Sequence, residues 1–426
     1  MKKLLMCSAA IALGLAVAAP AKADGIKLDL AGHFKGYVTW LSQDTNDEPL
    51  AKASIRHFDI LRETEIHFTG ETTLDNGLTV GVHHQALIDS PTTDGLGGTG
   101  VDLFATRKSY AYFSGAWGRV NFGKEDGANY LLEVAAPSAD ENFDGLRQYV
   151  NPFNIAVTNI RNLNVANNGA GAGGVGLGLG RGYFNTGKLD YANDATGFNN
   201  KLTYLTPVWN GFQAGGSYTP STSNGGLAVG GIPGANDTSK AFALPTNNND
   251  DTFGSAWEGA ARYEGKWQEL GVTLGGGYTH VGLQADTDLG GADHLSSFHQ
   301  WNLGAALTWQ QFGLGGVYTQ DNGAIDSNGR NRTWVGGIDY TTGPFKLGAS
   351  YLNNHEGMGQ TAGLVDQGSL DTTRWAGGVV YTYGPGMTFR GSVGWVRTTL
   401  PAIQLDALDT NHSHATDVLL GTQINF

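Results

Sequence analysis

The chain has 426 residues and a net charge of −13 at pH 7, with 65 glycines, one cysteine and only 15% charged residues. An average soluble domain is about 25% charged, so this composition argues against two or three ordinary soluble domains. The acidic balance also argues against nucleic acid as a partner.

The first segment in chain order, residues 1–23, has the organisation of a secretory signal peptide. Two lysines precede a short apolar run, and Ala21 and Ala23 form an A-x-A cleavage site. We therefore expect export through the general secretory pathway and a mature chain of one domain, residues 24–426. Loss of three lysines changes the net charge to −13 − 3 = −16, and loss of Cys7 leaves no thiol for disulfides or catalysis.

From residue 26 onward, apolar and polar residues alternate with a period of two, which is the signature of β-strands. The apolar face of residues 26–40 carries Ile26, Leu28, Leu30, Phe34, Val38 and Trp40. The same alternation recurs at 301–309, 312–318, 334–340 and 345–351. No apolar run after the first segment reaches the ~18 residues that a transmembrane helix needs. The pattern predicts an all-β protein.

Aromatic residues at the strand ends favour a membrane barrel over a soluble sandwich. Trp301 and Trp309 bracket the apolar face of one strand, as the two aromatic girdles of an outer-membrane barrel require. The opposite face is polar in strand after strand, which suits lipid outside and water inside. Short turns alternate with long polar stretches at 90–104, 126–197, 220–254, 281–297, 321–331, 353–370 and 399–414. We therefore predict a transmembrane antiparallel β-barrel of about 16 strands, with short periplasmic turns and long extracellular loops.

Three motifs follow one another along the chain: IHFTGETTLDNGLTVGV at 66–82, RKSYAYFSGAWGRVNFGKEDG at 107–127 and NNKLTYLTPVWNGFQAGGSY at 199–218. Together with the terminal Phe426 they resemble the trimeric, sixteen-stranded general diffusion porins of Gram-negative outer membranes. The resemblance implies a homotrimer without cofactors that contacts outer-membrane lipid and lipopolysaccharide and passes small polar solutes. It also implies that Phe426 is the assembly signal read by the outer-membrane insertion machinery.

The resemblance further implies that the third long loop, about residues 126–197, folds into the barrel and narrows it. Its stretch PSADENFDG, residues 137–145, occupies the place of a family motif in that loop. The acids expected at the constriction are Glu133, Asp140, Glu141 and Asp144. The chain departs from the family in a long glycine-rich insert at 169–182, in Lys201 where the family has serine, and in a missing arginine just before the motif at 199–218.

The basic half of the constriction is expected on the strands. The family register points Arg107 inward, and alternation places four further bases on the polar face: Lys201, Arg262, Arg374 and Arg390. Acids and bases that face each other across a narrow channel create a transverse field. The negative charge and the acidic loop predict a weak cation preference. Each of these bases is equally well explained as an ordinary lumen side chain, because barrel interiors are polar whatever their function.

Two further patterns resemble metal sites. Residues 140–145 read D-x-N-x-D-G, the start of a calcium loop, but Asn151 stands where the loop needs its bidentate glutamate. The predicted inner face of the first strands also carries four histidines near two acids, namely His33, His57, His67 and His83 near Glu63 and Glu65. We interpret these as lumen residues without a fixed ligand geometry, and we predict no metal site.

The favoured function is passive diffusion of small hydrophilic solutes, without catalysis. A channel selective for a sugar or an organic acid is a second possibility, since the long insert and the missing arginine depart from the general pattern. A surface adhesin or binding barrel with a plugged lumen is a third. A hydrolase would need a nucleophile and a base at one rim, and no catalytic motif supports one.

Overall fold

The computed structural model describes residues 25–43, 57–89, 105–150, 189, 191–222, 253–283, 296–324, 330–357, 360–361, 365–366, 369–399 and 412–426. The predicted signal peptide, the glycine-rich insert and Asn151 lie outside these residues. Among the described residues, no helix is long and apolar enough to cross a membrane.

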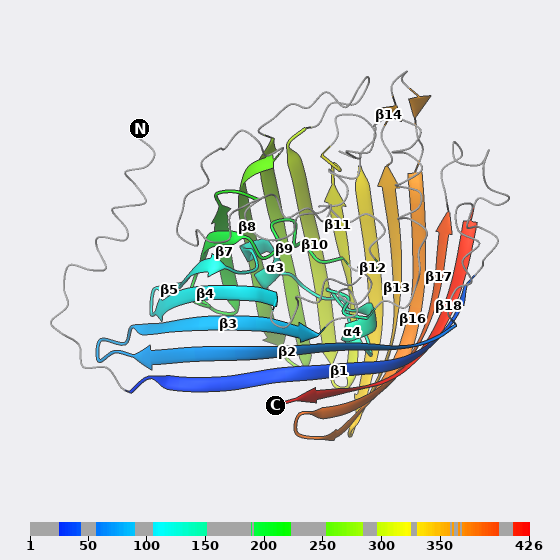
Figure 1. The fold of residues 1–426 in the computed structure, drawn as a ribbon, viewed down its shortest axis with the longest axis horizontal. Helices are drawn as coiled ribbons and strands as arrows, with labels where there is room; N and C mark the ends of the chain where they lie inside the picture. Colours follow the sequence, from blue (N-terminus) through cyan, green and yellow to red (C-terminus); the bar gives the residue numbers. More distant parts are fainter. Residues whose placement is uncertain are drawn as a thin grey trace.

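Sixteen antiparallel strands of the described chain form one closed barrel, in which β1 pairs with both β2 and β18 (Figure 1). The barrel strands are β1 (Lys27–Gln43), β2 (Phe58–Thr73), β3 (Thr79–Asp89), β4 (Ala105–Gly115), β5 (Gly118–Lys124), β6 (Asn200–Leu205), β7 (Phe212–Thr219), β8 (Phe253–Trp267), β9 (Leu270–Leu283), β10 (Phe298–Trp309), β11 (Phe312–Asp321), β12 (Asn331–Thr342), β13 (Phe345–Gly357), β16 (Ser369–Gly384), β17 (Met387–Thr399) and β18 (His412–Asn425). A separate two-stranded sheet joins β14 (Gln360–Thr361) to β15 (Val365–Asp366). The predicted closed antiparallel barrel is confirmed.

The barrel is apolar outside and polar inside, the reverse of a soluble protein. On β10, for example, Leu303 is 60% exposed on the outer face while its neighbour Asn302 is only 3% exposed. Alternation along each strand produces this arrangement, because successive side chains point to opposite faces of a sheet. Lipid is the solvent that an outer face of this kind requires.

Aromatic side chains form two rows on the outer face, one near each end of the strands. The row nearer the long connections contains the cross-strand pairs Tyr218–Trp257, Trp301–Tyr318, Tyr318–Trp334 and Tyr351–Trp375. The row nearer the short turns contains Phe312–Tyr340 and Phe345–Tyr381. Ring centroids within these pairs lie 4.2–5.0 Å apart. These rows match the girdles predicted from the sequence.

Phe426 pairs with β1 at the end of the barrel that carries the short turns, where C is marked (Figure 1). The backbone N–H of Gly32 donates to the carbonyl of Phe426 over 2.7 Å, and the N–H of Phe426 donates back to Gly32 over 3.1 Å. The terminal residue therefore takes part in closing the barrel, and its ring is exposed on the outside. Its role as an assembly signal stays a prediction.

Candidate functional site

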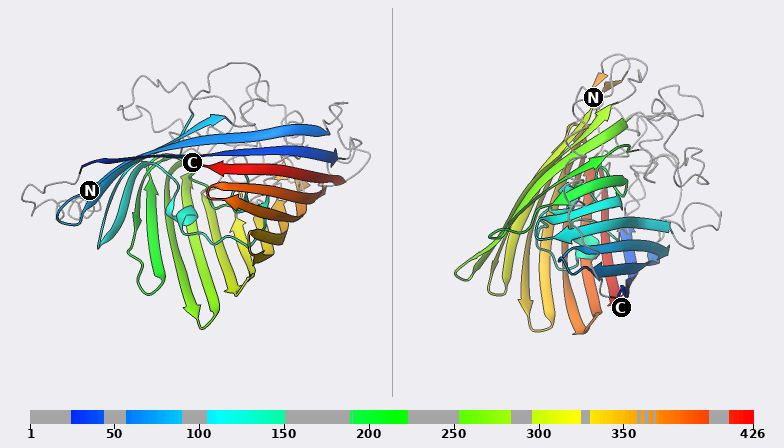
Figure 2. Two further views of the ribbon diagram at one scale, coloured as in Figure 1. Left: turned by 90° about the horizontal axis from the view of Figure 1, so that it is seen from below. Right: turned by 90° about the vertical axis from the view of Figure 1, so that its left-hand side faces the viewer.

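The segment after β5 enters the barrel and carries two short helices, α3 (Ala128–Leu131) and α4 (Glu141–Asp144). Both helices lie within the ring of strands (Figures 1 and 2). Asp140 begins α4 as its N-cap, since its side chain accepts a hydrogen bond from the backbone N–H of Asn142 over 3.3 Å. The loop predicted to fold into the lumen is therefore present in residues 125–150 and 191–199.

Glycines on the inner wall let the loop lie directly against the strands. The sites at which an added Cβ atom would collide with the loop include Gly277 against Asn129, Gly304 against Val134, Gly337 against Pro137, Gly348 against Ala139 and Gly394 against Phe143. At Gly348 the added atom would lie 2.5 Å from the Ala139 nitrogen. The loop thus follows the wall from β9 to β17. Nothing in the sequence separates these glycines from the many others.

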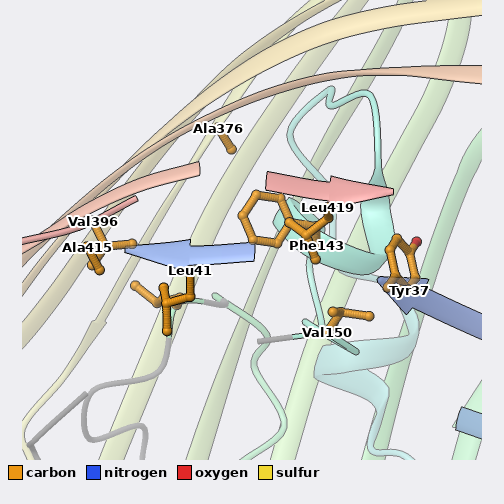
Figure 3. Close-up of a cluster of buried hydrophobic side chains, with 9 residues drawn as sticks. Tyr37, Leu41, Phe143, Val150, Ala376, Val396, Ala415 and Leu419 are labelled. Atoms are coloured by element: carbon orange, nitrogen blue, oxygen red, sulfur yellow. The ribbon is translucent and has the colours of Figure 1, made fainter. Parts of the chain in front are cut away.

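Phe143 of α4 fixes the far end of this path in an apolar cluster (Figure 3). Its fully buried ring packs among side chains of β1, β16, β17 and β18, namely Tyr37, Leu41, Ala376, Val396, Ala415 and Leu419. Val150 and Leu189, which come directly before and after residues 151–188, pack in the same cluster. Burying such a ring contributes roughly 1.5–3 kcal/mol relative to leaving it exposed.

Asp140, one of the four predicted constriction acids, is buried against the wall. Arg390 donates to its Oδ1 over 2.7 Å, Ser392 donates to its Oδ2 over 3.1 Å, and the Tyr37 hydroxyl lies 3.1 Å from both oxygens. The carboxylate therefore binds α4 to β1 and β17, and its charge is matched by Arg390.

Two more of the predicted acids also act as anchors. Glu133 accepts hydrogen bonds of 2.8 Å from the Asn193 backbone and from the Asn302 side chain. Asp144 accepts from the Ser350 hydroxyl over 2.6 Å. Burial raises the pKa of Asp144, although the nearby Arg374 and the Ser350 bond act to lower it.

Only Glu141 of the four acids is exposed. The other three acids that were expected at the constriction instead form buried contacts that hold the loop in place.

Three of the predicted wall bases also bind the loop through its backbone. Arg374 is fully buried and donates to the carbonyls of Phe143 over 3.4 Å, Asp144 over 3.3 Å, and Leu189. Lys201 is buried and donates to the carbonyls of Gly197 over 2.6 Å and Glu125. The half-buried Arg262 donates to the carbonyl of Glu133 over 2.6 Å. Strand alternation was enough to place these side chains inside the barrel. Their role as anchors of the loop could not be predicted, because it depends on the path that the loop takes.

Arg107 faces the interior because of an irregularity in β4. The register against β3 shifts between Gln85 and Ala86, which pair with Lys108 and Thr106. Arg107 is the extra residue of this bulge, and both Arg107 and Lys108 reach inward. Strict alternation would send one of the two outward, so the sequence analysis missed Lys108.

These two bases join a charged network between β2, β4 and the loop. Arg107 lies 2.8 Å from Glu63 and also contacts Glu65. Lys108 lies 2.6 Å from Asp126, which a second base, Arg147, approaches to 2.8 Å. This network was not predicted from the sequence, since its members are separated along the chain and join only when the loop folds inward.

In the pairs with acids on β2 and at 125–126, the basic member is the one nearer to water, whereas Asp194, the second acid at Arg147, is 20% exposed. The side chains of Arg107, Lys108 and Arg147 remain 25%, 19% and 13% exposed, whereas their acidic partners on β2 and at 125–126 are 5% exposed or less. Burial acts to raise the pKa of Asp126, but Arg147 and Lys108 outweigh it and hold that pKa below its usual value. The network therefore presents cationic ends to water, and Asp126 beneath them stays ionised.

Comparison with known sequences identifies a family over nearly the whole chain. Residues 8–399 match the family model of the Gram-negative porin. An uncharacterised protein of Rickettsia prowazekii (strain Madrid E) is 27% identical over 258 residues, and one of Rickettsia conorii is 26% identical over 256 residues. The first match spans 50% of this chain and 59% of the relative, so the chain spans about three-fifths of the length of these relatives.

Solved structures share the fold over nearly the full length of both chains. An anion-selective porin from Comamonas acidovorans superposes with a TM-score of 0.56 at 17% identity, over 94% of this chain and 100% of that one. OmpT of Vibrio cholerae in its trimer form gives 0.54 at 11% identity, over 95% and 100%. Salmonella typhi OmpF in complex with daunomycin gives 0.54 at 14% identity, over 94% and 98%. At these identities the likeness shows the fold.

Proposed function

Because the chain belongs to the Gram-negative porin family, and is thus an outer-membrane porin channel, we propose that it passes small hydrophilic solutes by passive diffusion. The observation that supports this proposal is the path of the inserted loop. Its residues 129–143 lie against glycines of the wall from β9 to β17, so this part of the loop narrows the channel from one side. A porin channel carries out no catalysis, and the solutes are selected by size and charge at the narrowest section.

The assembly proposed for this channel is a homotrimer in outer-membrane lipid and lipopolysaccharide. The trimer form of the structurally similar OmpT supports this proposal. Export through the general secretory pathway with residues 1–23 as the signal, and recognition of Phe426 by the insertion machinery, complete it.

The weak cation preference stays a prediction. Of the four acids that motivated it, Glu141 alone is exposed, and the charged network turns the bases Arg107, Lys108 and Arg147 toward water. The net negative charge of the chain still favours cations. Reversal potentials across a salt gradient decide between these opposing contributions.

A planar-bilayer recording of the purified full-length protein tests the proposed function. A diffusion channel gives stepwise openings whose conductance rises in proportion to salt concentration, and it makes liposomes permeable to small sugars regardless of their stereochemistry. An absence of open steps from folded protein would contradict the proposal and favour the plugged adhesin or binding barrel.

A channel selective for an organic acid is the second candidate, favoured by the cationic ends of the network. Arg107, Lys108 and Arg147 also lie near aromatic rings, with the Arg147 guanidinium 4.0 Å from the Tyr130 ring centroid and 5.0 Å from that of Phe198. Saturable block of the conductance by one organic acid, and not by a sugar of similar size, would support this candidate.

A further inference from the structure

We infer that the inner wall of β1 and β2 carries a binding site for a divalent first-row transition metal such as Zn²⁺, formed by His33, Glu65 and His67. One ring nitrogen of each histidine and one carboxylate oxygen lie within 4.8 Å of one another. The site belongs to the half of the barrel that carries the short turns, because His33 pairs with Asn425 at the end of the chain. It does not depend on whether the channel conducts.

Strand geometry brings the three ligands together. Glu65 and His67 are two residues apart on β2, so their side chains share one face. His33 is the direct cross-strand partner of Glu65. The His67 Nε2 atom lies 3.3 Å from the Glu65 Oε2 atom, and the rings of His33 and His67 meet edge to face with centroids 6.1 Å apart. Ligands on paired strands are held more precisely than ligands on loops.

The Nε2 atom of His33 has an unused bonding capacity. It is shielded from solvent and has no hydrogen-bond partner among the described residues. A shielded imidazole nitrogen without a partner is costly, whereas a metal bond would satisfy it. His57, the fourth histidine of the sequence pattern, does not join the site, because it lies beside Leu41, eight residues along β1 from His33.

Neighbouring side chains orient the carboxylate as an outer shell does in known metal sites. The Gln85 amide donates to Glu65 Oε2 and Arg107 donates to Oε1, so the two oxygens have different partners. Arg107 also binds Glu63, which leaves it a counter-ion when Glu65 binds a cation. Thr69 similarly orients His83, whose ring lies 5.5 Å from that of His67.

Two imidazoles and one carboxylate form a ligand set that suits Zn²⁺ and similar ions, with a position left for water. Ligand atoms around a tetrahedral ion with bonds of about 2.0–2.1 Å lie about 3.4 Å apart, so small ring rotations must close the 4.8 Å spread. The His67 side chain is 28% exposed, which gives an ion access from the lumen. The positive charges of Lys35 and Arg107 on the same wall repel a divalent cation. Zn²⁺ must therefore compete with them for the neighbouring carboxylates.

The test titrates Zn²⁺ into purified, tag-free, full-length protein by competition with a chromogenic chelator. The background carries His280→Gln and His299→Gln, since the Nδ1 atoms of these two histidines lie 3.4 Å apart and form a second pair. We expect a Zn²⁺ site in this background whose affinity falls at least about tenfold in His67→Gln and in Glu65→Gln, the loss typical of an outer-shell change alone. His84→Gln is the matched control, because the neighbouring residue His83 faces the site and alternation turns His84 away.

A second measurement guards against misfolded variants. Each variant must retain the far-UV circular dichroism and thermal unfolding of the parent. In a conducting channel, Zn²⁺ added to the bilayer should also shift the parent's reversal potential toward anions. Equal Zn²⁺ affinity in the parent and in folded His67→Gln would overturn the site, as would equal losses in His67→Gln and His84→Gln. Because the chelator titration needs no conduction, a plugged barrel would contradict the proposed function and leave this test intact.

Discussion

The inner wall of the barrel holds the inserted loop in two different ways. From β9 to β17 the wall meets the loop with glycines, and the backbones approach until an added methyl group would collide. From β1 to β5 the wall meets it with charges, including the pairs of Lys108 with Asp126 and with Glu125. Close backbone contact, together with the buried bases Arg374 and Arg390, therefore holds the loop on one side of the channel, whereas partly exposed ion pairs meet it on the other.

The two sides should respond differently to change. Contact between backbones has little tolerance, because a packed wall accommodates extra volume only through strain. Partly exposed ion pairs are screened by salt and contribute modestly to stability. Variants on the glycine side are therefore expected to move the loop, and variants on the charged side to alter ion selectivity.

The largest effect is expected at Arg374, the buried cation that binds three loop carbonyls. Arg374→Met leaves these oxygens without their donor, at a cost of about 1–3 kcal/mol each. We expect the free energy of unfolding to fall by about 3 kcal/mol or more and the conductance to rise as the loop loosens. Urea titration and single-channel recording measure the two quantities. Arg397→Met on the adjacent strand is the control, since Arg397 is exposed; equal effects of the two changes would contradict the anchoring role.

Gly337 tests the close contact between the loop and the glycines of the wall. In Gly337→Ala the added methyl group would overlap the Pro137 carbonyl, so we expect a destabilisation of about 1–3 kcal/mol and an altered conductance. Gly336→Ala is a matched control, because nothing lies within 4 Å of a Cβ atom at that neighbouring residue. Unaltered conductance and stability in Gly337→Ala would show that the wall and the loop are not in contact there.

Asp140→Asn should have a smaller effect. The amide keeps an acceptor for the Tyr37 hydroxyl but loses the charge that pairs with Arg390, at a cost of about 1.5 kcal/mol. We expect a lower midpoint of thermal unfolding. The reversal potential should change little, since the lost charge is buried and paired. A large shift in ion selectivity with unchanged stability would show that Asp140 takes part in selecting ions.

The smallest change in stability is expected for the adjacent Glu141→Gln. Because Glu141 is exposed, the unfolding midpoint should stay constant while the reversal potential shifts toward anions. Lys108→Met should shift the reversal potential in the opposite direction. Identical reversal potentials in parent, Glu141→Gln and Lys108→Met would place the selectivity filter elsewhere in the channel.

Much of the fold was predictable because strand alternation is a local property. Leu303 beside Asn302 is enough to assign the outer and inner faces of β10, and the same reasoning placed Arg374 and Arg390 inside the barrel. Arg107 was placed through a family resemblance, whereas Lys108 was missed because a bulge interrupts the alternation. The roles of Glu133, Asp140 and Asp144 were not predictable, since each depends on a partner more than 100 residues away along the chain or on the course of the loop.

The sequence by itself determined the barrel and its inside and outside, since these follow from a period of two and from the length of the connections, whereas the segment that enters the barrel was implied by the family resemblance. Only the tertiary structure decided which acids face water and which bind the wall. The physical reason is that charge in a channel depends on burial and pairing, and both arise from contacts between distant segments. The proximity of His33 to Glu65 and His67 was likewise decided by the tertiary structure, because cross-strand register brings together side chains that are far apart in the linear sequence.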